Sequence, residues 1–226
     1  MVICFFARCC TACLCEVLNL EIYDLSDGSW HSNCYALISR GGDGIAHAAI
    51  VDPSSSAQNI VTFLNAKQAR LDFIILTHGH FDHILKLDEL RALTGAPAYI
   101  HKDDAVMLGD GRKNAFSLFF GGELSLSDAD MLLDGGEVLM LGDEQIEIIS
   151  TPGHSRGSIC LLCPDFIITG DTVFANGYGR YDLYGGDLAT LRESLISLKK
   201  YPPSLRLYAG HGKASTLGAA IENLYV

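Results

Sequence analysis

Three histidines and one aspartate crowd into a single six-residue stretch of the sequence, within the run Thr77-His78-Gly79-His80-Phe81-Asp82-His83. Neutral imidazole is the commonest metal-binding side chain, and imidazole mixed with carboxylate suits zinc, iron or manganese. His78 and His80 are two positions apart and point the same way in an extended segment, so they can bind one ion. Asp82 and His83 could hold a second ion beside it. A lone histidine would be read as a surface residue, but this density predicts a metal site.

Three more side chains of the same kind follow predicted strands further along the chain: His154 after Thr151-Pro152-Gly153, Asp171 after Gly170, and His211 between Gly210 and Gly212. The first group also follows an apolar run, residues 73–76. Ligand crevices of α/β sheets form at the carboxyl ends of strands. We therefore expect these four loops to meet at one edge of the fold.

The elements that must position these loops can be read from apolar patterning and turn residues. Strands are expected over residues 17–23, 35–39, 46–51, 73–76, 98–101, 138–141, 146–150, 158–162, 166–169 and 205–209. Helices are expected from cap candidates at residues 54–56 to about residue 70, and over residues 84–93, 103–108 and 187–200.

The run Thr-His-Gly-His-Phe-Asp-His resembles the H-x-H-x-D-H signature of the metallo-β-lactamase superfamily, and the resemblance covers roughly residues 17–226. It implies an α/β fold, a four-layer αββα sandwich in which two mixed β-sheets are flanked by helices. It also implies a set of metal ligands: His78, His80 and His154 for one ion, Asp82, His83 and His211 for a second, and Asp171 bridging both.

The same resemblance implies a cofactor and a mechanism. Two divalent metal ions are expected, zinc first, with iron or manganese as alternatives. A hydroxide shared by the two ions would attack a carbonyl carbon, with Asp82 and Asp171 as the catalytic side chains. Paired ions of this kind clamp the attacking and leaving oxygens of a displacement.

Within the superfamily, several segments resemble the glyoxalase II (hydroxyacylglutathione hydrolase) branch. They are Gly170-Asp171-Thr172, where the best-known β-lactamases carry a cysteine ligand, together with Pro152-Gly153-His154-Ser155 and Gly179-Arg180-Tyr181-Asp182. The expected activity is hydrolysis of a small thioester or ester. The alternatives are a persulfide dioxygenase-like enzyme with one iron, a lactonase or β-lactamase-like hydrolase, and a metal-binding module without activity. Full-length members continue into a helical C-terminal domain that contacts glutathione, which argues against S-lactoylglutathione as the physiological substrate.

Composition excludes several classes of function. The formal net charge of −11 disfavours a nucleic-acid partner, which requires clustered lysine and arginine. No apolar run approaches the roughly 20 residues that span a bilayer, so no membrane partner is expected. Residues 1–16 hold five of the eight cysteines and are expected to be a leader outside the domain at 17–226; the alternative is a thiolate metal cluster. Free thiols in this number suit a reducing cytoplasm.

Several remaining polar side chains have alternative interpretations. Arg180 is expected either to bind a substrate carboxylate or to brace its loop, and Lys86 to lie on a solvated helix face. His31, His47 and His101 are expected to be structural. Residues 109–130, with aromatic side chains at 116, 119 and 120, are expected either to cover the substrate or to pack against the sheet.

Overall fold

The computed structural model describes residues 20–28, 30–222 and 224. The expected leader at residues 1–16, with its cysteines, lies outside the described residues. The described part of the chain folds into two six-stranded sheets and one small two-stranded ribbon.

The first sheet is mixed. Its strands, in spatial order, are β1 (Leu20–Asp24), β2 (Tyr35–Arg40), β3 (Ala46–Val51), β4 (Ala69–Ile75), β5 (Ala98–His101) and β6 (Met131–Leu133). β1, β2 and β3 pair antiparallel, and β3 to β6 pair parallel. The parallel half requires crossovers through helices, because parallel neighbours cannot be joined by a tight hairpin.

The second sheet is also mixed. Its strands, in spatial order, are β14 (Ser215–Thr216), β13 (Arg206–Ala209), β10 (Phe166–Gly170), β9 (Ile159–Leu162), β8 (Glu144–Ser150) and β7 (Val138–Leu141). β10 and β13 pair parallel, and the other pairs are antiparallel. The ribbon consists of β11 (Val173–Phe174) and β12 (Gly177–Tyr178).

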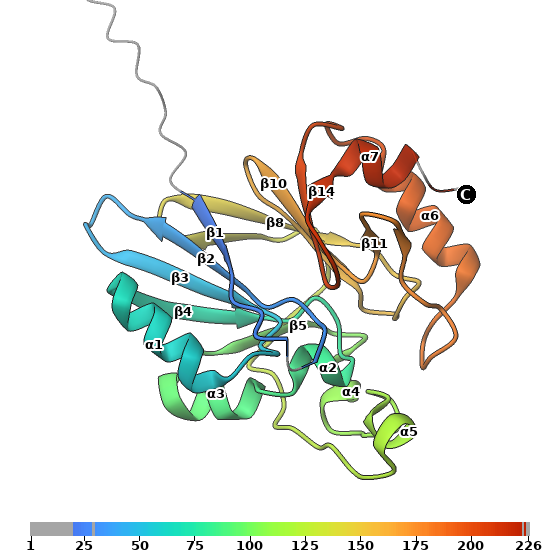
Figure 1. Ribbon diagram of the computed structural model, residues 1–226, viewed down its shortest axis with the longest axis horizontal. Coiled ribbons are helices and arrows are strands. Elements are labelled where there is room, and N and C mark those ends of the chain that lie inside the picture. Colours follow the sequence, from blue (N-terminus) through green and yellow to red (C-terminus); the bar gives the residue numbers. More distant parts are fainter. Residues whose placement is uncertain (1–19, 29, 223, 225–226) are drawn as a thin grey trace, which may run out of the picture.

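Helices cover the outer face of each sheet (Figure 1). The first sheet is covered by α1 (Ala57–Lys67) and α3 (Leu87–Thr94), and the second by α6 (Leu188–Leu198) and α7 (Leu217–Glu222). Three shorter helices lie in the connections: α2 (Phe81–Ile84), α4 (Ala105–Leu108) and α5 (Phe116–Phe120). The expected αββα sandwich is therefore confirmed.

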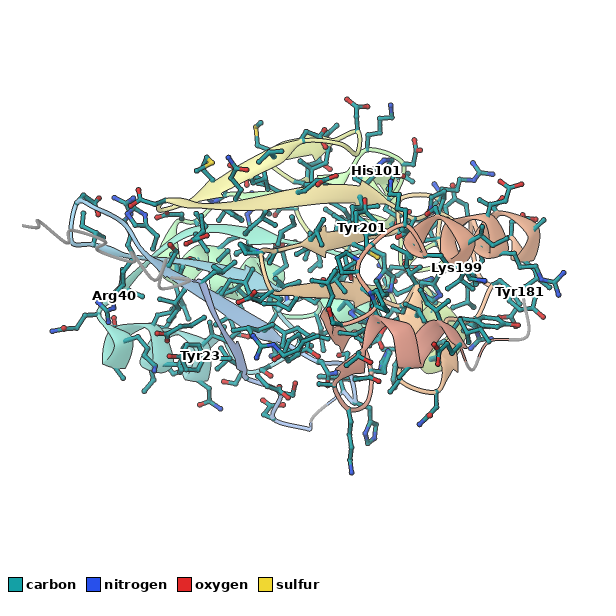
Figure 2. The ribbon with its side chains drawn as sticks, turned by 90° about the horizontal axis from the view of Figure 1, so that it is seen from above. Tyr23, Arg40, His101, Tyr181, Lys199 and Tyr201 are labelled. Carbon is teal, nitrogen blue, oxygen red and sulfur yellow. The ribbon has the colours of Figure 1, made fainter. Side chains whose placement is uncertain are left out.

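Alternation along the strands divides the buried apolar side chains into three layers. Ala36 and Ile38 of β2 face the helices, whereas Tyr35 and Leu37 of the same strand face the second sheet. Successive side chains of a strand point to opposite faces, so one strand serves two layers. A third layer joins the second sheet to α6 and α7. Side chains fill the space between the sheets in Figure 2, where Arg40 and Tyr181 lie at opposite ends of the molecule.

The three cysteines outside the N-terminal segment pack as small apolar residues, as predicted. Cys34, Cys160 and Cys163 are buried and unbridged. Burial raises the pKa of the Cys34 thiol to about 12 and that of Cys160 to about 11. Neutral thiols of this kind are poor nucleophiles, so no redox role follows from the Cys160-x-x-Cys163 spacing.

Two expected helix boundaries were wrong. The helix predicted to reach residue 70 ends at Lys67, with Gln68 in the left-handed conformation at φ 52°. Ala69 already pairs with Ala46 of β3, and this parallel pairing determines the boundary. The helix predicted over residues 84–93 is two helices, because the backbone N–H of Lys86 donates to the carbonyl of Pro53 at 3.0 Å.

Several short elements were not predicted at all: β6, β11, β12, β14 and α7. The strands among them span only two or three residues and are formed through their pairing with a neighbouring strand. Such short runs carry no periodic signal in the sequence. No helix among the described residues is long and apolar enough to cross a membrane.

His47, at the start of β3, generates a stability prediction. Its Nδ1 lies 2.6 Å from Asp72 and its Nε2 lies 3.2 Å from Asp43. The hydrogen bond to Asp72 raises the pKa of His47, although partial burial opposes it. A folded pKa above the unfolded value of about 6.5 contributes stability below that pH and loses it as pH rises through the folded pKa.

We therefore expect His47→Gln to lower the free energy of unfolding by about 1.5 kcal/mol at pH 6 and by clearly less at pH 9. Urea unfolding of both proteins at each pH, after treatment with a chelator, measures the difference without a contribution from bound metal. An equal loss at both pH values would contradict the charged pair.

Candidate metal site

Four strand ends bring polar loops to one edge of the sandwich. The loop after β4 carries His78 and His80, and those after β8, β10 and β13 carry His154, Asp171 and His211. The backbone of Thr77 accepts a hydrogen bond from the N–H of Ile159 at 2.9 Å, which joins the two sheets directly at this edge. The expected meeting of these loops is therefore seen in the structure.

Three buried histidines form the first group at this edge. One ring nitrogen from each of His78, His80 and His154 lies within 4.8 Å of the other two. His80 Nδ1 and His154 Nε2 are 2.8 Å apart. Tetrahedral zinc with bonds of about 2.0 Å places its ligand atoms about 3.3 Å apart, so the three nitrogens can converge on one ion with small adjustments.

A second group lies beside the first and is more open. It consists of Asp82, His83 and His211, whose ligand atoms also lie within 4.8 Å of one another. His211 Nε2 is 3.3 Å from Asp82 Oδ2, and His83 Nε2 is 3.7 Å from the same oxygen. The His83 side chain is fully buried, whereas those of Asp82 and His211 are 19% and 31% exposed. Solvent and small molecules therefore reach the site from this side.

The carboxylate of Asp171 lies between the two groups. Its Oδ2 is 3.6 Å from His154 Nε2 in the first group and 3.3 Å from His211 Nε2 in the second. Its Oδ1 is buried without a hydrogen-bond partner among the described residues. Gly210 permits this position, because a Cβ there would lie 2.2 Å from Asp171 Oδ1.

Hydrogen bonds on the far side of the rings determine which nitrogen faces the site. The Nδ1–H of His83 donates to Asp52 at 2.9 Å, that of His154 to the carbonyl of Arg180 at 2.7 Å, and that of His211 to the carbonyl of His31 at 2.8 Å. Each acceptor offers a lone pair to the ring, so Nδ1 carries a proton and Nε2 is the nitrogen that faces the site. Metal-binding histidines are typically oriented in this way.

The pKa values of the histidines shift in opposite directions in the two groups. Burial lowers the pKa of His80 to about 3 and holds that of His78 well below its usual range. Burial opposes the charged form of His83 too, but Asp82, Asp171 and Asp52 outweigh it and raise its pKa to about 9. Similarly, hydrogen bonds to Asp171 and Asp82 overcome burial and raise the pKa of His211 to about 11.

This donor set fits divalent cations. His78 Nε2 is buried without a hydrogen-bond partner among the described residues, as is Asp171 Oδ1, and a buried polar atom is normally paired. An ion contacting these atoms would satisfy both. The same carboxylates that attract protons to His83 and His211 attract a cation in their place.

Asp52 supports the site and was not identified from the sequence. Its Oδ1 accepts the backbone N–H of Thr77, and its Oδ2 accepts the Thr77 hydroxyl at 2.6 Å and the His83 ring. Asp52, His78 and His83 are also close enough to form a third group of possible ligands. Because the Asp52 oxygens are already engaged, this carboxylate positions His83 and serves the site indirectly.

Asp104 is a second supporting carboxylate that sequence reasoning missed, because it stands in no recognisable motif. Its Oδ2 accepts the Gly79 N–H at 3.0 Å and the Ser155 hydroxyl at 2.6 Å, and its Oδ1 accepts the Gly157 N–H at 2.7 Å. Gly79 lies between His78 and His80, and Ser155 follows His154. One buried side chain therefore joins the two loops of the first group.

The structure shows one of the two roles expected for Arg180, the bracing of its loop. Its guanidinium makes a bidentate pair with Asp182, at 2.7 and 2.9 Å, and its carbonyl holds the His154 ring. Arg180 thus braces its loop; a contact with substrate stays a prediction. Lys86 pairs with Glu89 at the start of α3.

The three remaining histidines lie outside both groups. His47 lies near the start of β3, at the end of the strand away from the site. The ring of buried His101 donates from Nε2 to the carbonyl of Asp134. His31 contributes only its carbonyl, which accepts the hydrogen bond from His211. Residues 116–120 form α5, whose rings contact Phe81 and Trp30, whereas Leu124, Leu126 and Ala129 of the same segment pack against the buried layer of the first sheet.

Comparison with known proteins agrees with this architecture. Residues 27–211 match the family model of the metallo-β-lactamase superfamily. The probable metallo-hydrolase YqgX of Bacillus subtilis is 35% identical over 191 residues, which is 82% of this chain and 87% of YqgX.

Two solved structures also resemble the chain. The BLEG-1 B3 metallo-β-lactamase superposes with a TM-score of 0.80 at 31% identity, covering 88% of this chain and 95% of that one. The structure of TTHA1623 in a di-iron-bound form gives a TM-score of 0.71 at 28% identity, covering 87% and 96%.

The Asp104 contacts generate a prediction about metal affinity. In Asp104→Asn the amide nitrogen replaces one acceptor, so at least one of the three donors loses its partner and the two loops separate. We expect metal affinity to fall by about tenfold, as is typical when a group supporting a ligand is changed. Competition with a chromophoric chelator measures the affinity of both ions.

Asp103→Asn provides the matched control, because Asp103 is the adjacent aspartate and its side chain is half exposed. Unchanged affinity in a folded Asp104→Asn protein would show that the loops hold their positions without this carboxylate.

Proposed function

The chain belongs to the metallo-β-lactamase superfamily, and we propose that it is a hydrolase that binds two divalent metal ions and cleaves a small thioester or ester, as glyoxalase II does. The observation that carries the proposal is the position of Asp171, whose carboxylate lies between two groups of three ligand side chains. A carboxylate in this position can contact two ions at once. The proposed ligands are those named from the sequence: His78, His80, Asp82, His83, His154, Asp171 and His211.

The chemistry can be assigned to particular side chains. Divalent ions held here would lower the pKa of a bound water to about 7 and polarise the carbonyl of the substrate. Asp82 lies at the open side of the site, where its carboxylate can accept a hydrogen bond from the attacking water and orient it. The hydrogen bonds from His83, His154 and His211 to their acceptors keep the ring orientations constant during turnover.

Zinc is proposed as the first occupant. Imidazole and carboxylate donors bind zinc readily, and its lack of redox chemistry suits hydrolysis. The same donors accept iron and manganese, and the similar protein TTHA1623 was solved with two irons.

A second candidate, opening of a β-lactam ring, is favoured by the 31% identity to the BLEG-1 B3 metallo-β-lactamase. It needs the same nucleophile and the same ions and differs in the substrate. Hydrolysis assays should therefore include a chromogenic cephalosporin beside the thioesters.

The first experiment is elemental analysis of protein purified without added metal, combined with assays of S-lactoylglutathione and simpler thioesters. We expect about two ions per chain and thioester hydrolysis that is lost on chelation and restored by zinc. One iron per chain without hydrolysis would contradict the proposal and favour an oxygenase, to be assayed with glutathione persulfide. Cephalosporin turnover alone would favour the second candidate.

Replacement of the shared carboxylate is the sharpest mutational test. Asp171→Ala should lower the metal content towards one ion per chain and reduce kcat/KM by roughly 10³, about 4 kcal/mol of transition-state stabilisation. Asp165→Ala, at an exposed position in the hairpin before β10, should change neither quantity. Two ions and undiminished turnover in Asp171→Ala would exclude a bridging role.

A further inference from the structure

Five aromatic side chains from three separate segments gather next to the candidate metal site. This aromatic cluster consists of Trp30, Phe81, Phe116, Phe119 and Phe120. Phe81 is its centre, because its ring lies 5.5 to 6.2 Å from each of the other four. In Figure 1, α5, which carries three of the rings, lies beside α2, which begins with Phe81.

Each segment of the aromatic cluster is attached to a proposed metal ligand. Phe81 stands between His80 and Asp82 in the chain. Trp30 precedes His31, whose carbonyl accepts the hydrogen bond from His211.

The third attachment runs through α5. Phe119 lies beneath the guanidinium of Arg180, at 5.9 Å, and the carbonyl of Arg180 accepts the hydrogen bond from His154. The backbone N–H of Phe81 also donates to the carbonyl of Asn114, which leads into α5. The aromatic cluster is therefore linked, along the chain or through one hydrogen bond, to proposed ligands in three different loops.

The outer part of the aromatic cluster is exposed. Phe119 and Phe120 are 51% and 54% exposed, and α5 contains no buried residue. Exposed aromatic side chains are unfavourable in water, and a patch of them is typical of a binding site. Because three segments of the aromatic cluster adjoin proposed ligands, a molecule bound at those ligands is positioned to cover these rings.

We propose that the aromatic cluster binds an apolar group of the substrate and so selects thioesters or esters that carry an aliphatic or aromatic substituent next to the scissile bond. This inference rests on the proposed hydrolase function and specifies its substrate class. The substituent can belong to the acyl side or to the leaving thiol, and both contact aromatic faces in the same way.

Two substrate series distinguish these sides. In the first, N-acetylcysteamine is the constant thiol and the acyl group is acetyl or hexanoyl. In the second, acetyl is constant and the thiol is N-acetylcysteamine or benzyl mercaptan. We expect at least one series to favour the apolar member by about tenfold in kcat/KM, the lower end of what one methylene contributes in an enclosed apolar pocket, because this surface is partly exposed.

The test variant is the double substitution Phe119→Ala and Phe120→Ala, whose positions are exposed enough to spare the fold. It should remove most of that preference, measured as the ratio of kcat/KM between the two members of each series. Leu132→Ala is the matched control, because Leu132 is 56% exposed on edge strand β6, away from the aromatic cluster. It should leave the preference unchanged.

A binding measurement separates this inference from the proposed function. Trp30 is the single tryptophan of the chain, so its fluorescence reports on the aromatic cluster directly. We expect the non-hydrolysable thioether S-hexyl-N-acetylcysteamine to change this emission and the S-ethyl analogue to bind about tenfold more weakly. The double variant should lose the difference between the two thioethers.

The outcomes are distinct. Hydrolysis of all thioesters without preference, together with equal binding of the two thioethers, would overturn the inference and leave the proposed hydrolase intact. Absence of thioester hydrolysis would overturn the proposed function, and the fluorescence titration would still decide whether the cluster binds apolar groups. A preference confined to the benzyl series would support the inference and assign the apolar group to the thiol.

Discussion

The buried carboxylate of Asp171 imposes the constraint on which the site depends. Moving a charge out of water is costly unless opposite charges and hydrogen-bond donors surround it. Here His83 and His211 keep the pKa of Asp171 well below its usual range against the effect of burial. The imidazoles in turn need acceptors on their far side, and Asp52 and two backbone carbonyls supply them. One buried charge thus requires an ordered shell around it.

That shell explains how two separate sheets act as one scaffold. Asp104 joins the loop after β4 in the first sheet to the loop after β8 in the second. Asn33 lies near the first sheet and donates to the carbonyls of Ala209 and Gly212 at the end of β13. The apolar layer between the sheets sets their separation, and these polar contacts align their edges. Because these loops are hydrogen-bonded to both sheets, they can keep the ligand atoms in position without long ordered segments in the loops themselves.

In the proposed function, the polar site binds the reacting carbonyl and the aromatic cluster discriminates between substrates. The ligand set by itself does not select a substrate, which agrees with the breadth of a superfamily that includes B3 metallo-β-lactamases and probable metallo-hydrolases. Discrimination between substrates must come from surfaces beside the ions, because function resides in sites added to a fold. In this chain the aromatic cluster is one such surface, and α5, which carries three of its five rings, has no buried residue.

From the sequence, apolar alternation and turn residues predicted the principal strands, and histidine and aspartate directly after strands predicted loops that meet at one edge. The αββα class and the set of seven ligands came from the resemblance of the H-x-H-x-D-H run to the metallo-β-lactamase superfamily. Only the tertiary structure decided that Asp52 and Asp104 support the site, that Arg180 braces His154, and that Trp30 and α5 adjoin Phe81. Each of those contacts joins residues at least 25 positions apart. Such contacts depend on how the sheets and loops pack, and no periodic pattern in the sequence predicts them.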